Sequence, residues 1–169
     1  MLFTEIRTLE NITALSKAEL RRAEHRCGIE LLYELLWKHF KIKEPVIKKS
    51  EGGKPYIDEN GVFFNISHSN GVIACVVSDN EVGIDIELID SKQKNEFLTI
   101  AERFFTPSEI DFVREAENVN EAFYRVWTRK EAFAKLNDIP LSKVFSHDTM
   151  LDNTSTEIRD GYVISIARH

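Results

Sequence analysis

Two carboxylates stand two residues apart in the stretch Val82-Gly-Ile-Asp-Ile-Glu87. Side chains two apart on a β-strand point to the same face, so Asp85 and Glu87 would project side by side while the isoleucines face a core. Adjacent carboxylates repel each other, and a divalent cation such as Mg²⁺, which prefers oxygen ligands, removes that cost. The alternative is an ordinary solvent-facing strand, because Asp-x-Glu is a common pattern.

A third carboxylate occurs in the stretch Trp127-Thr-Arg-Lys-Glu-Ala-Phe-Ala-Lys135. Glu131 and Lys135 are four residues apart, which places them on one face of a helix, where they could complete a site for a metal and a phosphate. The alternative is a surface ion pair worth only about 0.2–0.5 kcal/mol. Trp127 is expected in the core.

A histidine follows serine in Phe64-Asn-Ile-Ser-His-Ser-Asn70. His68 comes at the end of an expected strand, where it could contact a phosphate or exchange a proton near neutral pH. Ser67 is not expected to be a hydrolase nucleophile, because no G-x-S-x-G pattern surrounds it. The alternative is a turn with local hydrogen bonds.

Basic residues gather at two places in the first half. Arg21, Arg22, His25 and Arg26 form one cluster, and Lys54 follows Gly53 in a Gly-Gly-Lys-Pro turn. Lysine and arginine bind phosphate, and glycines let a ligand approach the backbone. The alternative is a solvated helix face and a plain turn.

The elements that must position these residues follow from hydrophobic periodicity and capping signals. Ser16 and Glu19 form a capping box that predicts a long helix to about Phe40. Asn70-Gly71 predicts a hairpin. We expect strands at 2–9, 62–67, 72–78, 82–88 and 162–167, the middle three in an antiparallel meander, and helices at 93–105, from 106 and at 121–136, with a loop at 146–160.

This order of elements is consistent with an α+β fold of two similar halves, residues 1–79 and residues 80–169. The 169 residues are 43% hydrophobic and carry a net charge of −6, which disfavours non-specific nucleic-acid binding. Cys27 and Cys75 are expected to be buried thiols in a reducing compartment. We see neither a secretory signal nor an apolar run long enough to cross a bilayer, so we expect a soluble cytoplasmic protein.

Four motifs occur in a fixed order: G-K-P, F-N-I-S-H-S, V-G-I-D-I-E and F-Y-x-V-W-x-x-K-E-A-x-x-K. Together with His25-Arg26 and the stretch 101–109, they resemble the 4′-phosphopantetheinyl transferase superfamily, in its surfactin-synthetase-activating (Sfp-type) branch. The resemblance implies two pseudo-symmetric halves with the active site in the cleft between them. It also implies transfer of phosphopantetheine from coenzyme A to a serine of an apo acyl or peptidyl carrier protein, with release of adenosine 3′,5′-bisphosphate.

The resemblance assigns roles to individual residues. Asp85, Glu87 and Glu131 would bind Mg²⁺, with Mn²⁺ as an alternative. Our own hypothesis for the base is Glu131, acting directly or through a metal-bound water, with Glu87 as the rival candidate. Lys135 and Lys130 would contact the pyrophosphate. The remaining ligand contacts would come from His68 and Arg26 at the phosphates of coenzyme A, Gly53 and Lys54 near the nucleotide, and a hydrogen bond from Ser67. Glu131, Lys135 and His68 would be catalytic.

Two rival functions remain open at this stage. One is a non-catalytic module that binds coenzyme A or a carrier protein, which would need no metal. The other is a metal-dependent nuclease or phosphohydrolase that uses the same carboxylates. Because one chain carries both halves, we expect a monomer.

Overall fold

The computed structural model describes residues 1–59, 61–89 and 94–169, without the side chains of residues 94 and 95. The strands are β1 Leu2–Thr8, β2 Ile47–Lys49, β3 Pro55–Ile57, β4 Phe63–Ser69, β5 Val72–Ser78, β6 Val82–Leu88, β7 Thr154–Arg159 and β8 Tyr162–Arg168. The helices are α1 Lys17–Leu35, continued as a π-helical turn over Leu36–Phe40, α2 Lys94–Phe104, α3 Pro107–Glu115 and α4 Val119–Asn137. Short 3₁₀ turns occur at Ile12–Ala14, Leu141–Lys143 and Thr149–Leu151.

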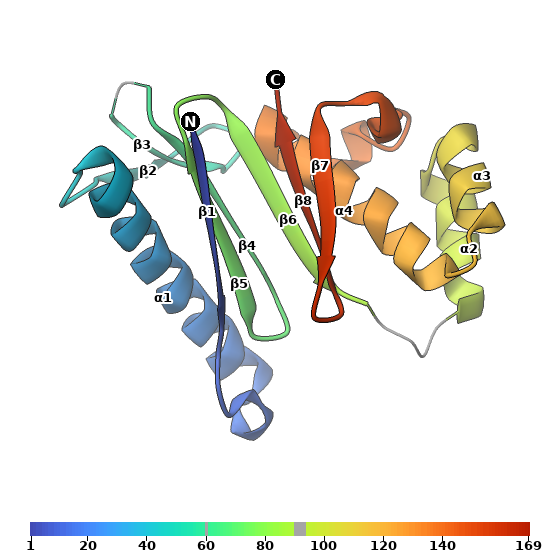
Figure 1. Cartoon of the computed structure of the whole chain (residues 1–169), viewed down its shortest axis with the longest axis horizontal. Coiled ribbons are helices and arrows are strands. Elements are labelled where there is room, and N and C mark those ends of the chain that lie inside the picture. Colours follow the sequence, from blue (N-terminus) through green and yellow to red (C-terminus); the bar gives the residue numbers. More distant parts are fainter. Residues whose placement is uncertain (60, 90–93) are drawn as a thin grey trace.

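The two three-stranded sheets have the same topology. In each, a strand and a helix precede a hairpin, and the second hairpin strand pairs with the first strand, which gives the orders β1-β5-β4 and β6-β8-β7. All these pairings are antiparallel. Helix α1 covers the first sheet and α4 covers the second, on the far side in the view of Figure 1. The prediction of an α+β fold with two similar halves is therefore confirmed.

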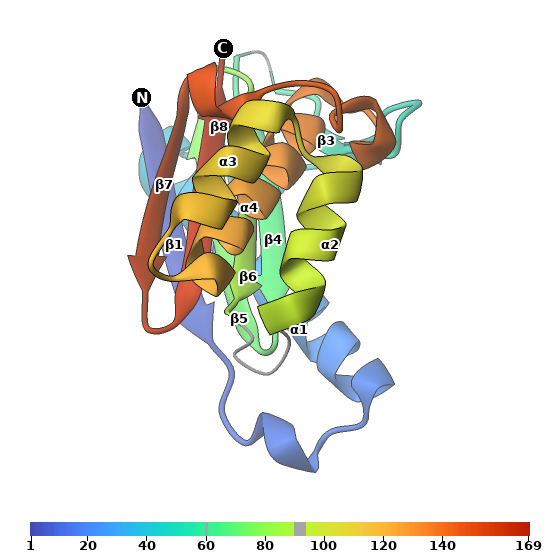
Figure 2. The same cartoon turned by 90° about the vertical axis from the view of Figure 1, so that its right-hand side faces the viewer.

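Apolar side chains fill the space on both sides of the first sheet. One cluster lies between α1 and the sheet and includes Leu31, Leu32 and Ile73. A second lies between the two sheets and includes Val76 and Ile84. A third cluster, rich in aromatic rings, lies between α4 and the pair α2 and α3, which pack over α4 in Figure 2. Trp127 packs against this third cluster, as expected.

Most predicted elements match the structure. Ser16 and Thr106 both form the capping boxes that start α1 and α3. Asn70 and Gly71 both have positive φ, at 48° and 82°, and turn β4 into β5 as the hairpin signal predicts. The predicted helix at 93–105 corresponds to α2, although residue 93 lies outside the described residues.

Two predictions are wrong. The meander fails because β6 pairs with β8 and not with β5. The expected loop at 146–160 contains β7, whose sequence Thr-Ser-Thr-Glu-Ile-Arg is polar because it forms the outer strand of its sheet. Threonine favours strands even where the strand is largely exposed, so composition alone concealed this element. The hairpin of β2 and β3 was also not predicted; each strand has only three residues.

No helix in the described parts of the chain has the length and apolar character needed to cross a membrane.

Candidate active site between the two sheets

β4 and β6 belong to different sheets, and polar side chains of β4 connect them by hydrogen bonds. The backbone N–H groups of Ile84 and Ile86 on β6 donate to Asn65 Oδ1 at 3.0 Å and to Ser67 Oγ at 3.4 Å, and that of Leu88 donates to Ser69 Oγ at 3.2 Å. Because side chains alternate along a strand, these three residues share the face of β4 that meets β6. The alternate polar residues of the stretch Asn-Ile-Ser-His-Ser therefore hold β6 beside β4 by hydrogen bonds.

Asp85 is the most buried carboxylate of the predicted set. It lies on β6 with 4% of its surface exposed. Its Oδ1 accepts hydrogen bonds from Ser67 Oγ at 2.9 Å and from Lys135 Nζ at 2.6 Å, and Lys135 Nζ also donates to Ser67 Oγ at 2.9 Å. Its other oxygen, Oδ2, is buried and has no hydrogen-bond partner among the described residues. Burial raises the pKa of Asp85, whereas the ammonium of Lys135 lowers it.

Glu87 and Glu131 add negative charge beside Asp85. Ser69 Oγ donates to Glu87 Oε2 at 2.8 Å. Burial, and then repulsion from Asp85, raises the pKa of Glu87 and of Glu131. One ammonium, that of Lys135, faces three carboxylates, so this region attracts further positive charge.

Helix α4 approaches β6 closely enough to bring these groups together. A Cβ atom on Gly83 would lie 2.1 Å from the carbonyl oxygen of Ala132 and 2.5 Å from the nitrogen of Leu136. Only glycine permits this contact, since real Cβ atoms do not approach within 3 Å. Gly83 therefore allows α4 to place Glu131 and Lys135 over Asp85, a role that the sequence analysis missed.

The turn between β2 and β3 is fastened to the end of α4. Lys54 Nζ donates to Leu136 O at 2.9 Å and to Val82 O at 3.3 Å, and the Lys54 backbone N–H donates to Asp138 Oδ1 at 3.2 Å. A Cβ atom on Gly52 would lie 2.3 Å from that same Oδ1. Burial lowers the pKa of Lys54.

A pocket of about 290 Å³ opens where this turn meets α4 and β4. Four predicted residues line it: Gly53 and Lys54 from the first half, and Glu131 and Lys135 from the second. Asn65 and Asp138 also line it and were not predicted. The alternation of polar side chains from Asn65 to Ser69 was the signal in the sequence that could have identified Asn65. Asp138 carries no such signal, because its contact with Lys54 spans 84 residues.

Lys130 does not line this pocket, and its contact with a pyrophosphate stays a prediction. Its side chain is fully buried and pairs with Glu109 at 2.8 Å. It also donates to His147 O at 2.8 Å and to Val144 O at 3.2 Å. Lys130 is five positions from Lys135, about 140° around the helix, so the two ammonium groups point to different sides of α4. Lys130 instead holds residues 144–147, which follow α4, against the helix by hydrogen bonds.

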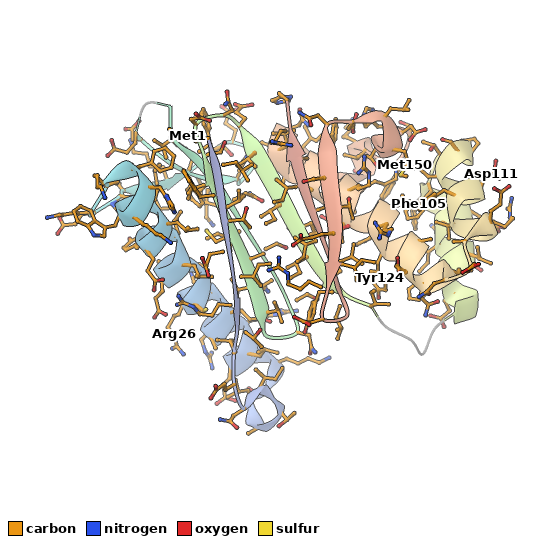
Figure 3. The ribbon with its side chains drawn as sticks, viewed as in Figure 1. Met1, Arg26, Phe105, Asp111, Tyr124 and Met150 are labelled. Atoms are coloured by element: carbon orange, nitrogen blue, oxygen red, sulfur yellow. The ribbon has the colours of Figure 1, made fainter. Side chains whose placement is uncertain are left out.

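The side chain of His68 and helix α1, which carries Arg26, lie on the side of β4 opposite to Asp85. His68 Nδ1 is 3.0 Å from Oε2 of Glu24, a buried residue of α1, and its ring is 42% exposed. Neighbouring residues on β4 alternate in direction, so His68 points to the α1 side and Ser67 to the β6 side. Arg26 is exposed on α1 and projects away from the strands in Figure 3. The structure brings neither residue to the pocket, and their predicted phosphate contacts are not tested.

The three carboxylates suit a divalent cation by their chemistry. They supply hard oxygen ligands, and one buried oxygen of Asp85 has no hydrogen-bond partner in the part of the chain that the structure describes. A cation would also relieve the repulsion between the carboxylates. Within the described residues, however, no three His, Cys, Asp or Glu side chains already converge as a metal-binding group. The cation that contacts Asp85 is the ammonium of Lys135.

Comparison with known protein families gives a match over the segment that carries the three carboxylates. A family model described as the 4′-phosphopantetheinyl transferase superfamily matches residues 81–164, a segment that contains Asp85, Glu87, Glu131 and Lys135. The chain belongs to this superfamily. Gly53, Lys54 and His68 lie outside the segment that the model of the superfamily matches.

Individual members of the superfamily match more of the chain. The chain is 37% identical over 119 residues to a 4′-phosphopantetheinyl transferase of Bacillus subtilis. This alignment covers 69% of the chain and 49% of the relative. The chain is 31% identical over 156 residues to 4′-phosphopantetheinyl transferase HetI of Nostoc sp., and that alignment covers 80% of the chain and 65% of the relative. It is 34% identical over 113 residues to 4′-phosphopantetheinyl transferase Sfp of Bacillus subtilis, covering 64% of this chain and 49% of the relative. The chain thus spans about half to two thirds of the length of these relatives.

Proposed function

We propose that this chain transfers the 4′-phosphopantetheine group of coenzyme A to a serine of an apo acyl or peptidyl carrier protein. One observation carries the proposal: a single pocket joins Gly53 and Lys54 of the first half to Glu131 and Lys135 of the second, beside the buried carboxylate of Asp85. A pyrophosphate is anionic and needs both a cation at its oxygens and a base nearby for the incoming hydroxyl. This pocket offers both.

The residues around the pocket would divide the work of binding. Lys135, which is 29% exposed, would turn from Asp85 towards the pyrophosphate. The backbone at Gly53 is open, because a Cβ atom there would meet no atom within 4 Å, so the nucleotide would pass close to it. His68 would contact a part of coenzyme A that extends along β4 beyond Ile66, on the same face, and Arg26 would reach a phosphate from α1.

The transfer step forms one bond and breaks one. The serine oxygen of the carrier attacks the phosphorus that carries the pantetheine arm, and the bond from that phosphorus to the oxygen of adenosine 3′,5′-bisphosphate breaks. The serine proton passes to Glu131 or Glu87, either of which is a carboxylate close enough to the pocket to act as the base. Positioning and charge neutralisation supply most of the rate in such reactions.

A divalent cation, Mg²⁺ or Mn²⁺, would be held by Asp85 Oδ2, Glu87 and Glu131 and would neutralise charge on the pyrophosphate. Ser67 and Ser69 would orient two of these carboxylates, since each serine already donates to one of them.

The division of the chain at residues 79 and 80 is part of this proposal. The first half would contact the nucleotide, and the second would hold the cation. We propose a monomer that acts in the cytoplasm; the two cysteines of the chain are free and buried, as a reducing compartment allows.

The test is intact-protein mass spectrometry of apo carrier proteins incubated with this chain, coenzyme A and Mg²⁺. We expect a mass gain of one phosphopantetheine that disappears with EDTA. Glu131→Gln should remove most turnover, whereas Arg114→Gln, an exposed change on α3, should not. Binding of coenzyme A without modification of any acyl, peptidyl or polyketide carrier would identify a binding module instead, and metal-dependent hydrolysis of nucleic acid would identify a nuclease.

A further inference from the structure

The segment that follows α1 carries positive charge that the proposed chemistry does not use. Residues 37–49 contain five lysines and one glutamate in a chain whose net charge is −6. Lys48 pairs with Asp58. The remaining lysines and one aromatic residue are exposed, and together we call them the lysine surface: Trp37, Lys38, Lys41, Lys43 and Lys49.

Two of these ammonium groups lie over the same exposed ring. Lys43 Nζ lies 4.8 Å and Lys41 Nζ 5.5 Å from the centre of the Trp37 ring. The indole attracts each ammonium, but the two ammonium groups repel each other. Such an arrangement gains most when an anionic group binds beside it. Glu34 and Glu44 are the nearest acidic residues in sequence. Glu34 pairs with Arg7, and among the described residues Glu44 forms no ion pair with these two lysines.

Apolar side chains accompany the charge. Trp37 is 47% exposed and Val46 is 65% exposed. Tyr56, which pairs with Lys48 across the hairpin, is also exposed. Exposed aromatic and aliphatic groups can supply contact area to a bound protein, and the surrounding charges can orient it.

The lysine surface adjoins the pocket. The hairpin of β2 and β3 lies between the end of α1 and the end of α4 in Figure 1. Lys49 on β2 is paired with Pro55 on β3, and Pro55 lines the pocket with Gly53 and Lys54. A protein bound on the lysine surface would therefore lie next to the pocket mouth, where a side chain of that protein could enter.

We infer that the lysine surface docks the acidic face of the carrier protein whose serine enters the pocket. This inference rests on the proposed function. A small anion is a poorer occupant, because these lysines lie on an exposed segment outside the pocket, whereas Lys135 and Lys54 line the pocket itself. Charge complementarity of this kind raises the rate of encounter and depends on ionic strength.

The experiment compares two variants with the same change in net charge. Lys41→Glu/Lys43→Glu reverses two charges on the lysine surface, and Arg103→Glu/Arg168→Glu reverses two exposed charges elsewhere. KM and kcat are measured separately for an acidic apo carrier and for coenzyme A, at low and at physiological ionic strength. Far-ultraviolet circular dichroism and thermal unfolding verify that each variant is folded, and Lys41→Gln/Lys43→Gln provides a milder change.

We expect the lysine variant to raise KM for the carrier at least tenfold at low ionic strength, with kcat and KM for coenzyme A unchanged. The glutamine variant should give a smaller rise, and the arginine control should stay within twofold of the wild type. The salt dependence of the wild type should largely disappear in the lysine variant.

Three results would overturn the inference. A rise in KM for coenzyme A would make this a nucleotide-binding surface. An unchanged lysine variant, with an active wild type, would remove the docking role and leave the proposed function intact. A wild type that modifies no carrier would remove both.

Discussion

Replacing Lys135 by methionine tests the central ion pair. The change keeps the length of the side chain but removes the ammonium that lies 2.6 Å from Asp85 Oδ1. Removing one partner of a buried ion pair costs about 3–5 kcal/mol, because the other charge stays buried without compensation. Asp85 is almost fully buried, but Lys135 is 29% exposed, so solvent already screens part of the attraction. We therefore expect a loss of about 2–3 kcal/mol in the free energy of unfolding.

The assay is urea unfolding, followed by circular dichroism at pH 7.5 with EDTA present. For a chain of this size the loss corresponds to a fall in Tm of about 4–12 °C. Arg114→Met is the control, because it breaks exposed pairs with Glu102 and Asp111 and should cost at most about 1 kcal/mol. The double variant Asp85→Asn/Lys135→Met should be more stable than the sum of the two single changes by about 1 kcal/mol or more.

The effect of Lys135→Met should also depend on pH. Burial already raises the pKa of Asp85, and without the ammonium this pKa rises further. A carboxyl whose folded-state pKa exceeds its unfolded value stabilises the fold when protonated, and that stability is lost as pH rises through the folded-state pKa. The deficit should therefore shrink as pH falls. A loss of less than about 0.5 kcal/mol at pH 7.5, the level of an ordinary surface change, would refute the reasoning.

Three further predictions concern other parts of the molecule. Gly83→Ala should displace α4 by about 1 Å, because its Cβ atom would lie 2.1 Å from Ala132 O. We expect thermal unfolding to show a loss of about 1–3 kcal/mol in stability, and the transfer rate to fall about a hundredfold. An unchanged transfer rate would contradict the close approach of α4 to β6. Burial raises the pKa of the Cys75 thiol, so iodoacetamide at pH 8 should label this thiol only after the protein unfolds. Mass spectrometry measures the labelling, and rapid labelling of the folded protein would argue against a buried thiol. Mg²⁺ should raise Tm more at pH 7.5 than at pH 5, because the raised pKa of Glu131 lets protons compete with the cation at lower pH, and Glu131→Gln should reduce the rise in Tm. Equal rises in Tm at both pH values would exclude these ligands.

The local pattern of the chain predicted much of the site. Alternation along 82–87 placed Asp85 and Glu87 on one face of a strand, and the structure has them there, beside Lys135. Helical spacing placed Glu131 with Lys135, and both line one pocket. These predictions succeeded because side-chain direction within one strand or helix depends on spacing alone.

The same rule separates the side chain of Lys130 from that of Lys135. Its five-residue separation from Lys135 already indicated a different helix face, but its partner could not be read from spacing. Glu109 lies on α3, 21 positions earlier in the chain, and meets Lys130 only because α3 packs on α4. Such a meeting depends on how helices pack, which a one-dimensional pattern does not contain.

The sequence by itself determined the strands, the helices, their capping and the faces on which the chemical groups lie, because those depend on neighbours along the chain. Only the tertiary structure decided that β6 pairs with β8, that His68 faces Glu24 of α1, and that Lys54 closes on the end of α4. Each of these contacts joins segments far apart in the chain. Their geometry follows from the packing of whole sheets and helices, including the close approach that Gly83 permits between α4 and β6.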